Sequence, residues 1–148
     1  MNNAVERMTK MFIGVDACDW EMVKDCMAET VHVDYSSMTG QPGGDVKTVD
    51  LIEGWKSLLP GFDATHHQLG NVVSKIDGNK AYIFSYVNAS HHLDNEDGKV
   101  WTVVGSYDID MKVIEGNWKI TSLKLNFKYQ DGNVNLPQLA TEAVAKKV

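Results

Sequence analysis

Apolar residues in the first third of the chain recur every three or four positions, the spacing typical of helices with one buried face. Residues 2–13 predict an opening helix whose apolar stripe consists of Val5, Met8, Met11 and Phe12. In "DWEMVKDCM", residues 19–27, Asp19 can cap a second, short helix. The core side of that helix carries Trp20, Val23 and Met27. A third helix is predicted over residues 46–61, where Pro60 and Gly61 end it.

Elsewhere the pattern alternates between apolar and polar residues, which is the period of strands. Residues 30–37, "TVHVDYSS", predict one strand, and the glycine-rich "MTGQPGGD", residues 38–45, predicts an irregular loop. Four β-rich runs follow over 62–76, 80–93, 99–113 and 118–129, separated by the turns "DGN", "DNEDG" and "EGN". The tail "NLPQLATEAVAKKV" predicts a short, frayed helix.

Helices followed by a long antiparallel meander define an α+β fold. The strand predicted over residues 80–93 is apolar on both faces, with Tyr82, Phe84 and Tyr86 on one and Ala81, Ile83 and Val87 on the other. A sheet of this kind is either covered on both faces or encloses a pocket. We therefore expect a curved sheet that is lined by helices.

Composition narrows the class of protein. A length of 148 residues favours one domain, and the net charge of -6 argues against binding to nucleic acid. No apolar run reaches the roughly 18 residues of a membrane span, and "MNNAVERMTKMF" lacks the features of a signal peptide. Cys18 and Cys26 have neither zinc-type nor thioredoxin-type spacing and suit free thiols. We expect a cytoplasmic protein that does not contact membranes.

Four of the five histidines form two doublets, His66-His67 and His91-His92, on adjacent predicted strands. Successive strand residues point to opposite faces, so each doublet sends one imidazole to each side of the sheet. If the turn "DGN" is a three-residue loop, His67 lies opposite Ala89 and shares its face with His91. If the loop has two residues, His67 shares its face with His92 instead. Either way, one histidine from each strand can reach a common cavity, while His66 and His92 are the expected outer members.

The order of these motifs resembles that of a known family. A helix, "VDACDWE", a strand ending in "DYSS", a glycine loop, "THHQLGN", a strand ending in "SHH" and "IEGNWKI" follow one another. This order resembles the SnoaL-like branch of the nuclear transport factor 2-like superfamily, and within it scytalone dehydratase most closely. The resemblance covers about residues 5–129 and leaves 130–148 as a C-terminal tail of one domain. It implies a cone-shaped barrel of a strongly curved, mixed but mainly antiparallel sheet, closed by the N-terminal helices.

The resemblance also implies a set of catalytic residues, which are Asp16, Tyr35, His67 and His91. It favours the three-residue turn. The chain departs from the family pattern where a second water-binding tyrosine is replaced by Val15, and where a serine and an asparagine fall on Gly105 and Tyr107. Tyr107 could restore a phenol from another wall.

These residues suggest acid-base chemistry without a metal or another cofactor, since the resembling family uses none. His67 would remove a proton α to a carbonyl, and Tyr35 would bind the enolate oxygen directly or through water. His91, paired with Asp16 if the geometry allows, would protonate a leaving hydroxyl. The outcome would be dehydration or isomerisation of a hydrophobic cyclic hydroxy-carbonyl compound. The expected pocket wall comprises Val15, Trp20, Leu69, Asn71, Val87, Trp101, Val103, Gly105, Tyr107 and Phe127.

Three alternatives stay open from the sequence. His67, His91 and Asp16 could form a facial metal triad. The altered pocket could belong to a non-catalytic module that binds a small molecule, or to an enzyme similar to polyketide cyclases. The resemblance further implies a homo-oligomer, a dimer or trimer, to which Tyr82, Phe84 and Tyr86 would contribute an apolar outer face.

Overall fold

The structure is a computed structural model that describes residues 3–147. Its helices are α1 (Asn3–Ala17), α2 (Trp20–Asp25), α3 (Ser36–Thr39), α4 (Thr48–Lys56) and α5 (Leu136–Ala145), with a short 3-10 helix η1 (Leu59–Gly61). Its strands are β1 (Met27–Asp34), β2 (Gly44–Lys47), β3 (Ala64–Asp77), β4 (Lys80–His92), β5 (Val100–Ile114) and β6 (Asn117–Gly132). The four long strands predicted from alternation are therefore confirmed as β3 to β6.

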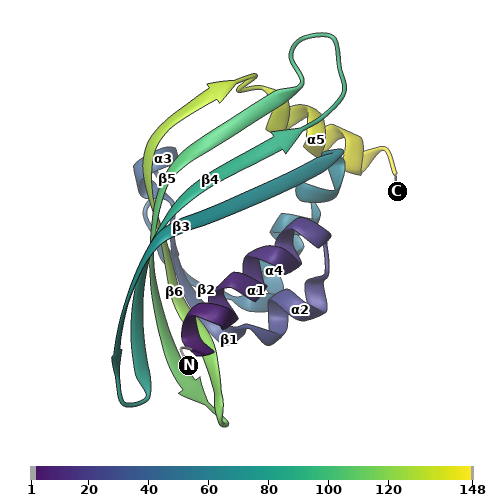
Figure 1. Ribbon diagram of the computed structural model, residues 1–148. Coiled ribbons are helices and arrows are strands. Elements are labelled where there is room, and N and C mark those ends of the chain that lie inside the picture. The colour runs from purple at the N-terminus through teal and green to yellow at the C-terminus, as the bar shows by residue number, and fades with distance from the viewer. Residues whose placement is uncertain (1–2, 148) are drawn as a thin grey trace.

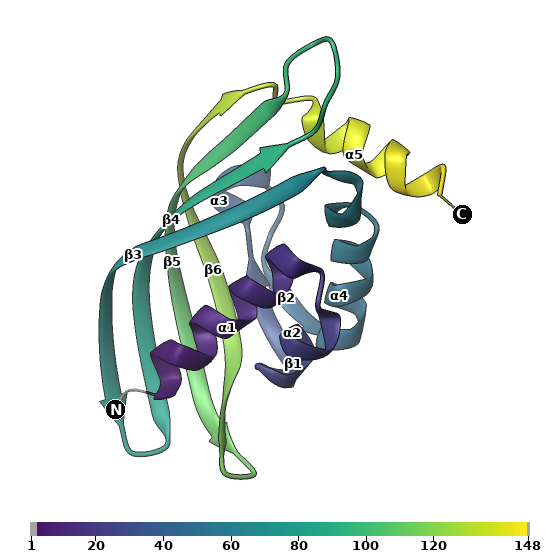
Figure 2. The ribbon, with the colours of Figure 1, turned by 45° about the vertical axis from the view of Figure 1, so that its right-hand side comes forward.

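All six strands form one sheet in the order β2-β1-β6-β5-β4-β3. Only β1 and β6 run parallel, so the sheet is mixed but mainly antiparallel. Figures 1 and 2 show that this sheet is strongly bent and that α1, α2 and α4 lie on its concave side. The α+β prediction is confirmed. The sheet is open, because β2 and β3 remain edge strands and do not pair with each other.

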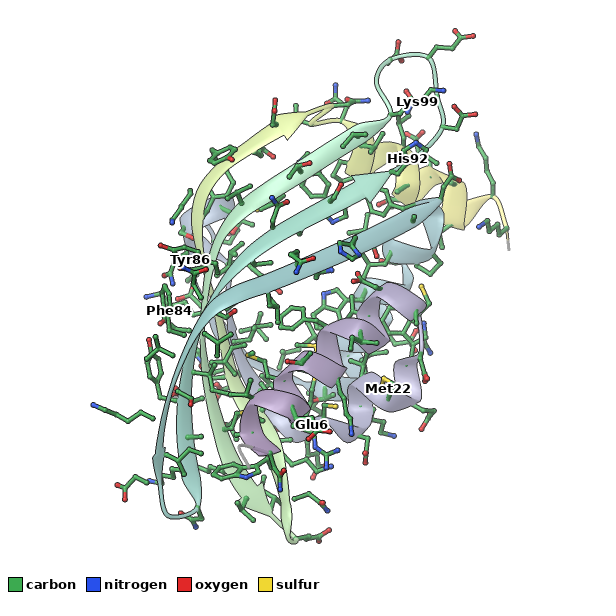
Figure 3. The ribbon with its side chains drawn as sticks, viewed as in Figure 1. Glu6, Met22, Phe84, Tyr86, His92 and Lys99 are labelled. Carbon is green, nitrogen blue, oxygen red and sulfur yellow. The ribbon has the colours of Figure 1, made fainter. Side chains whose placement is uncertain are left out.

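The core lies between the helices and the concave face of the sheet. Met8, Met11 and Phe12 of α1 are buried there against strand residues such as Ile83 and Ile109. On β4 every second residue from Ala81 to His91 is buried. Figure 3 shows Phe84 and Tyr86 on the opposite, convex face, directed away from the helices. The described residues thus cover only one face of the sheet.

Three local predictions from the sequence were wrong in detail. The glycine-rich stretch is not wholly irregular, because β2 forms there and pairs with β1, where Val31 lies opposite Val46. As a result α4 begins only at Thr48, whose hydroxyl donates to the backbone oxygen of Ala28. Met27 belongs to β1 rather than to the second helix. In each case pairing between strands supplies backbone hydrogen bonds that local periodicity does not reveal.

The C-terminal tail is a docked helix rather than a frayed one. Leu136 and Ala140 of α5 are fully buried. The helix packs directly on η1, where a Cβ atom at Gly61 would lie only 1.9 Å from the backbone oxygen of Ala140. This close approach requires glycine, and it places α5 at the same end of the molecule as the chain leading into β3 (Figure 2).

Candidate active site

The register of β3 against β4 decides which histidines face the helices. The turn after β3 has two residues, since Asp77 lies opposite Lys80, and the predicted three-residue loop is wrong. A β-bulge between Gly70 and Val73 then shifts the pairing by one residue. Above the bulge His67 lies opposite Ala89, and His91 lies opposite Thr65. The bulge therefore supplies the extra residue that the turn does not, and His67 shares its face with His91.

His67 is bound to Asp16, which α1 carries in its last turn. The His67 Nδ1 atom lies 2.7 Å from Asp16 Oδ1, and the backbone N–H of His67 donates to Asp16 Oδ2 at 2.8 Å. The hydroxyl of Thr65 donates to Asp16 Oδ1 at 2.9 Å. Because β3 is an edge strand, its outward N–H groups are free for such a contact. Asp16 thus holds both the ring and the backbone of His67.

The carboxylate of Asp16 is ionised. Burial raises its pKa, but the hydrogen bonds from His67 and Thr65 together outweigh burial, and the net pKa lies below its usual value. An ionised carboxylate only accepts hydrogen bonds, so Nδ1 of His67 carries the proton and a neutral His67 has its lone pair on Nε2. A carboxylate near the C-terminal end of a helix opposes the helix dipole. The position of Asp16 is therefore better explained by its contacts with His67 and Thr65 than by the stability of α1.

His91 has a different environment from His67. Its Nδ1 lies 3.0 Å from the backbone oxygen of Trp101, the residue opposite it on β5. The ring is buried, with the Trp101 ring at 4.3 Å and the Phe62 ring at 5.0 Å between centroids. This burial lowers the pKa of His91 to about 4, so the ring is neutral at neutral pH. The ring centroids of His67 and His91 are 6.1 Å apart.

Two phenols lie at the same cavity, Tyr35 directly after β1 and Tyr107 on β5. Among residues 3–147 neither hydroxyl has a hydrogen-bond partner in the protein. Burial raises the pKa of Tyr35 to about 12. Burial, together with the neighbouring Tyr35 and Asp16, raises the pKa of Tyr107 well above its usual value. Both phenols therefore stay protonated and can donate hydrogen bonds to a ligand.

These side chains surround a cavity of about 180 Å³. Apart from the two imidazoles and the two phenols, its wall is apolar or aromatic. The lining residues are Phe12, Val15, Tyr35, Met38, Trp55, Leu58, Leu59, His67, Val87, Ala89, His91, Trp101, Val103, Tyr107 and Leu125. A dry cavity of about 150 Å³ holds a benzene molecule. This cavity is therefore large enough for one six-membered ring with a few substituents.

The structure brings part of the predicted site together and leaves part of it outside. Of the predicted wall, Val15, Val87, Trp101, Val103 and Tyr107 line the cavity. The lining residues do not include Trp20, Leu69, Asn71, Gly105 or Phe127.

Three of those exceptions have physical reasons. Asn71 is exposed and forms part of the bulge, with φ at +51°. Gly105 has no side chain and lies so close to β6 that a Cβ atom would be 2.2 Å from the Asn126 oxygen. Trp20 is only partly buried and packs against the core instead.

Several lining residues were not predicted from the sequence. Phe12 lies one helical turn before Asp16, so the spacing of the opening helix could have revealed it. Its ring centroid is 5.5 Å from that of His67 and 5.0 Å from that of Tyr107. Ala89 follows from the register, once the bulge is known. Trp55 lies in the last turn of α4 and Leu58 directly precedes η1, and no sequence signal relates them to the histidines.

The facial triad that the sequence left open as an alternative does not form as a cluster. Asp16 binds Nδ1 of His67, whereas His91 binds a backbone oxygen. Across residues 3–147, no group of three His, Cys, Asp or Glu side chains is placed to hold a metal ion. In the same part of the chain no helix is both long and apolar enough to cross a membrane.

A curved sheet with helices in its concave face, and a polar cluster in an apolar hollow between them, is the architecture of the nuclear transport factor 2-like superfamily. Residues 5–124 match the SnoaL-like domain family, and the chain belongs to that family. A comparison with curated proteins finds no match.

Solved structures extend the fold assignment. The chain is similar to the Kfla4162 protein from Kribbella flavida, with 26% identity over 93% of this chain and 94% of that one, and a TM-score of 0.84. It is similar to a Novosphingobium aromaticivorans protein proposed to be a scytalone dehydratase, with 20% identity, coverage of 86% and 84%, and a TM-score of 0.72. It is also similar to hexachlorocyclohexane dehydrochlorinase LinA-type3 from Novosphingobium barchaimii LL02, with 16% identity, coverage of 88% of each chain and a TM-score of 0.68.

Proposed function

We propose that this protein is a cofactor-independent lyase that removes water from a cyclic β-hydroxy ketone. The observation that carries this proposal is the His67–Asp16 pair at the wall of an apolar cavity. Among the described residues Nε2 of His67 has no protein partner, so a ligand in the cavity can meet its lone pair. The names of the similar structures point in the same direction, because dehydratases and dehydrochlorinases both eliminate a small molecule across two neighbouring carbons.

In the first step, Nε2 of His67 takes a proton from the carbon next to the carbonyl. Asp16 keeps the ring in the tautomer with its proton on Nδ1 and stabilises the imidazolium that forms. A positioned general base contributes about 10²–10⁴ to the rate. The apolar wall strengthens the ion pair by excluding water.

The negative charge that leaves the carbon collects on the carbonyl oxygen as an enolate. Tyr35 and Tyr107 can both donate to this oxygen, directly or through a water molecule, because their high pKa values keep them protonated. Removing one donor of this kind from an oxyanion site typically costs about 10²–10³ in rate. In this proposal Tyr107 supplies a second phenol beside Tyr35, as the sequence suggested it could.

In the second step, the carbon–oxygen bond to the β-hydroxyl breaks and the enolate electrons form the new double bond. The proton on the imidazolium of His67 passes to the departing oxygen, which leaves as water, and the histidine returns to its starting state. One proton is taken and one is returned, so no external acid is needed. An isomerase would differ only in delivering that proton to another carbon.

The test substrate is β-hydroxycyclohexanone, which fits the cavity and loses water to give cyclohexenone. Mass spectrometry follows the formation of cyclohexenone. We expect turnover by the wild-type protein and a fall of about 10²–10⁴ in kcat for His67→Ala. His66→Ala is the matched control, since His66 is the exposed neighbour on the other face. If cyclic hydroxy-ketones bind in the cavity and none is converted, the proposal fails and a non-catalytic binding module takes its place.

A further inference from the structure

The second histidine of the cavity, His91, has a fixed tautomer. A backbone carbonyl can only accept a hydrogen bond, so the contact between Nδ1 and the Trp101 oxygen at 3.0 Å places the ring proton on Nδ1. The lone pair of the neutral ring is then on Nε2. Because Trp101 is the direct cross-strand neighbour of His91, the regular pairing of β4 with β5 maintains this arrangement.

The surroundings of the ring keep it in this state. His91 is only 5% exposed, and its ring lies between the aromatic rings of Phe62 and Trp101. The charged groups that act on it, His67 and Asp16, have opposite effects on its pKa, and burial dominates. Nε2 of His91 therefore has no proton to give at neutral pH, and the predicted role of proton donor does not suit this residue.

Nε2 of His91 has no hydrogen-bond donor among residues 3–147, although the ring lines the cavity. A polar atom in an apolar wall is costly unless a donor satisfies it. The phenols of Tyr35 and Tyr107 are donors, but the proposed reaction assigns them to the carbonyl oxygen of the ligand. Apart from Nε2 of His67, which the proposed reaction uses as the base, Nε2 of His91 is the ring nitrogen of this wall without a donor among residues 3–147, and its complement is a hydroxyl or an N–H group on the ligand.

We propose that His91 is a specificity-determining residue, whose Nε2 accepts a hydrogen bond from a hydroxyl group on the ring of the substrate. This inference rests on the proposed function, because it assigns the substrate of the same cavity to hydroxylated monocyclic carbonyl compounds. The reacting carbon faces His67, while the recognised hydroxyl faces His91. Unsubstituted rings and methyl ethers lack the donor and bind less well.

Binding of phenol and toluene tests this proposal without turnover. The two molecules have the same shape, and only phenol can donate. We expect His91→Phe to weaken phenol binding about tenfold relative to toluene in calorimetric titrations. His92→Phe is the matched control, since His92 is the exposed outer neighbour and should leave the phenol-to-toluene ratio unchanged. An unchanged ratio in His91→Phe overturns the proposal, as does a ratio that depends on His67 instead.

Nitrogen NMR of the histidine rings tests the same point in the wild-type protein, in case His91→Phe does not fold. At pH 7 we expect the signal of His91 Nε2 to be that of an unprotonated ring nitrogen. The signal should shift on addition of phenol and stay in place with toluene. A protonated Nε2 at pH 7, or equal responses to both compounds, contradicts the proposal. Selective binding of phenol without any dehydration of hydroxy-ketones would reject the proposed enzyme and support this role of His91.

Discussion

The two inward histidines line the same cavity but have different surroundings. His67 is bound to an ionised carboxylate, which holds the ring proton on Nδ1. His91 is buried between two aromatic rings, and this burial disfavours its charged form, although the hydrogen bond to the Trp101 oxygen acts in the opposite direction. The two rings therefore differ in burial and in the partner of Nδ1, and this difference supports the proposed roles of His67 as the base and His91 as an acceptor.

The buried His91 predicts a loss of stability in mild acid. Its pKa falls from 6.5 to about 4 on folding, so the unfolded chain binds more protons between these values and stability decreases as the pH falls. We expect about 2 kcal/mol of this effect between pH 7 and pH 5. Urea unfolding at both pH values would measure it, with His91→Gln showing a flatter pH dependence than the wild type.

His92→Gln provides the comparison for that experiment, because it removes an exposed histidine from the same strand. It should keep the wild-type pH dependence. His67 and Asp16 also face His91 and are present in all three proteins, so their own titration cancels in the comparison. Equal slopes for His91→Gln and the wild type would mean that His91 takes up protons equally in the folded and the unfolded protein, which contradicts a lowered pKa.

At the scale of elements, the bulge in β3 is the feature on which the site depends. Two residues, Asn71 and Val72, lie opposite the single residue Ser85. Without this extra residue the two-residue turn would place His67 on the face of His92, outside the cavity. Asn71 adopts the left-handed conformation that the bulge needs, with φ at +51°, which asparagine tolerates better than most residues.

Substitutions at Asn71 test this backbone role. Asn71→Gly should change the free energy of unfolding by less than about 1 kcal/mol, because glycine adopts a positive φ without strain. Asn71→Val should lower the free energy of unfolding by about 1–2 kcal/mol, because a β-branched residue is strained at positive φ. Urea unfolding of the two variants gives the comparison. If valine is tolerated as well as glycine, the bulge does not depend on this residue.

The long strands and the opening helix could be predicted from the sequence because their periodicity is strong over ten or more residues. The register could not, because turn length and bulge position together decide it, and only the turn has a clear sequence signature. The motif resemblance pointed to the right facing pair, His67 and His91, but attributed it to the wrong turn. The histidine that binds Asp16 could not be predicted either, because it depends on how α1 crosses the edge of β3.

At the scale of the whole molecule, the open sheet and its helices enclose a hollow that the side chains do not fill. The hollow lowers the packing energy of the protein, because apolar atoms in its wall lack van der Waals contacts on one side. Ala89, opposite His67 on β4, keeps the hollow open by being small.

The homo-oligomer stays a prediction. Sedimentation of the purified protein would measure its oligomeric state.

Filling the cavity should therefore trade binding for stability. We expect Ala89→Leu to raise the free energy of unfolding by about 0.5–2 kcal/mol, as cavity-filling changes commonly do. The affinity of the Ala89→Leu variant for phenol should fall at least tenfold, because the leucine side chain occupies the volume that the ligand needs. Asn88→Leu, on the exposed face of the same strand, is the control and should leave phenol binding unchanged. Unchanged binding in Ala89→Leu would place the ligand elsewhere.

Proton abstraction from carbon by His67 can be measured directly as hydrogen–deuterium exchange in D₂O. The ligand is γ-hydroxycyclohexanone, which has acidic hydrogens beside its carbonyl but no β-hydroxyl to eliminate. The wild-type protein should accelerate exchange at the α-carbons above the rate in buffer, as followed by NMR. His67→Ala and Asp16→Asn should lose this acceleration about 10²-fold or more, while His66→Ala should keep it. Binding of the ketone with exchange no faster than in buffer would contradict the assignment of His67 as the base.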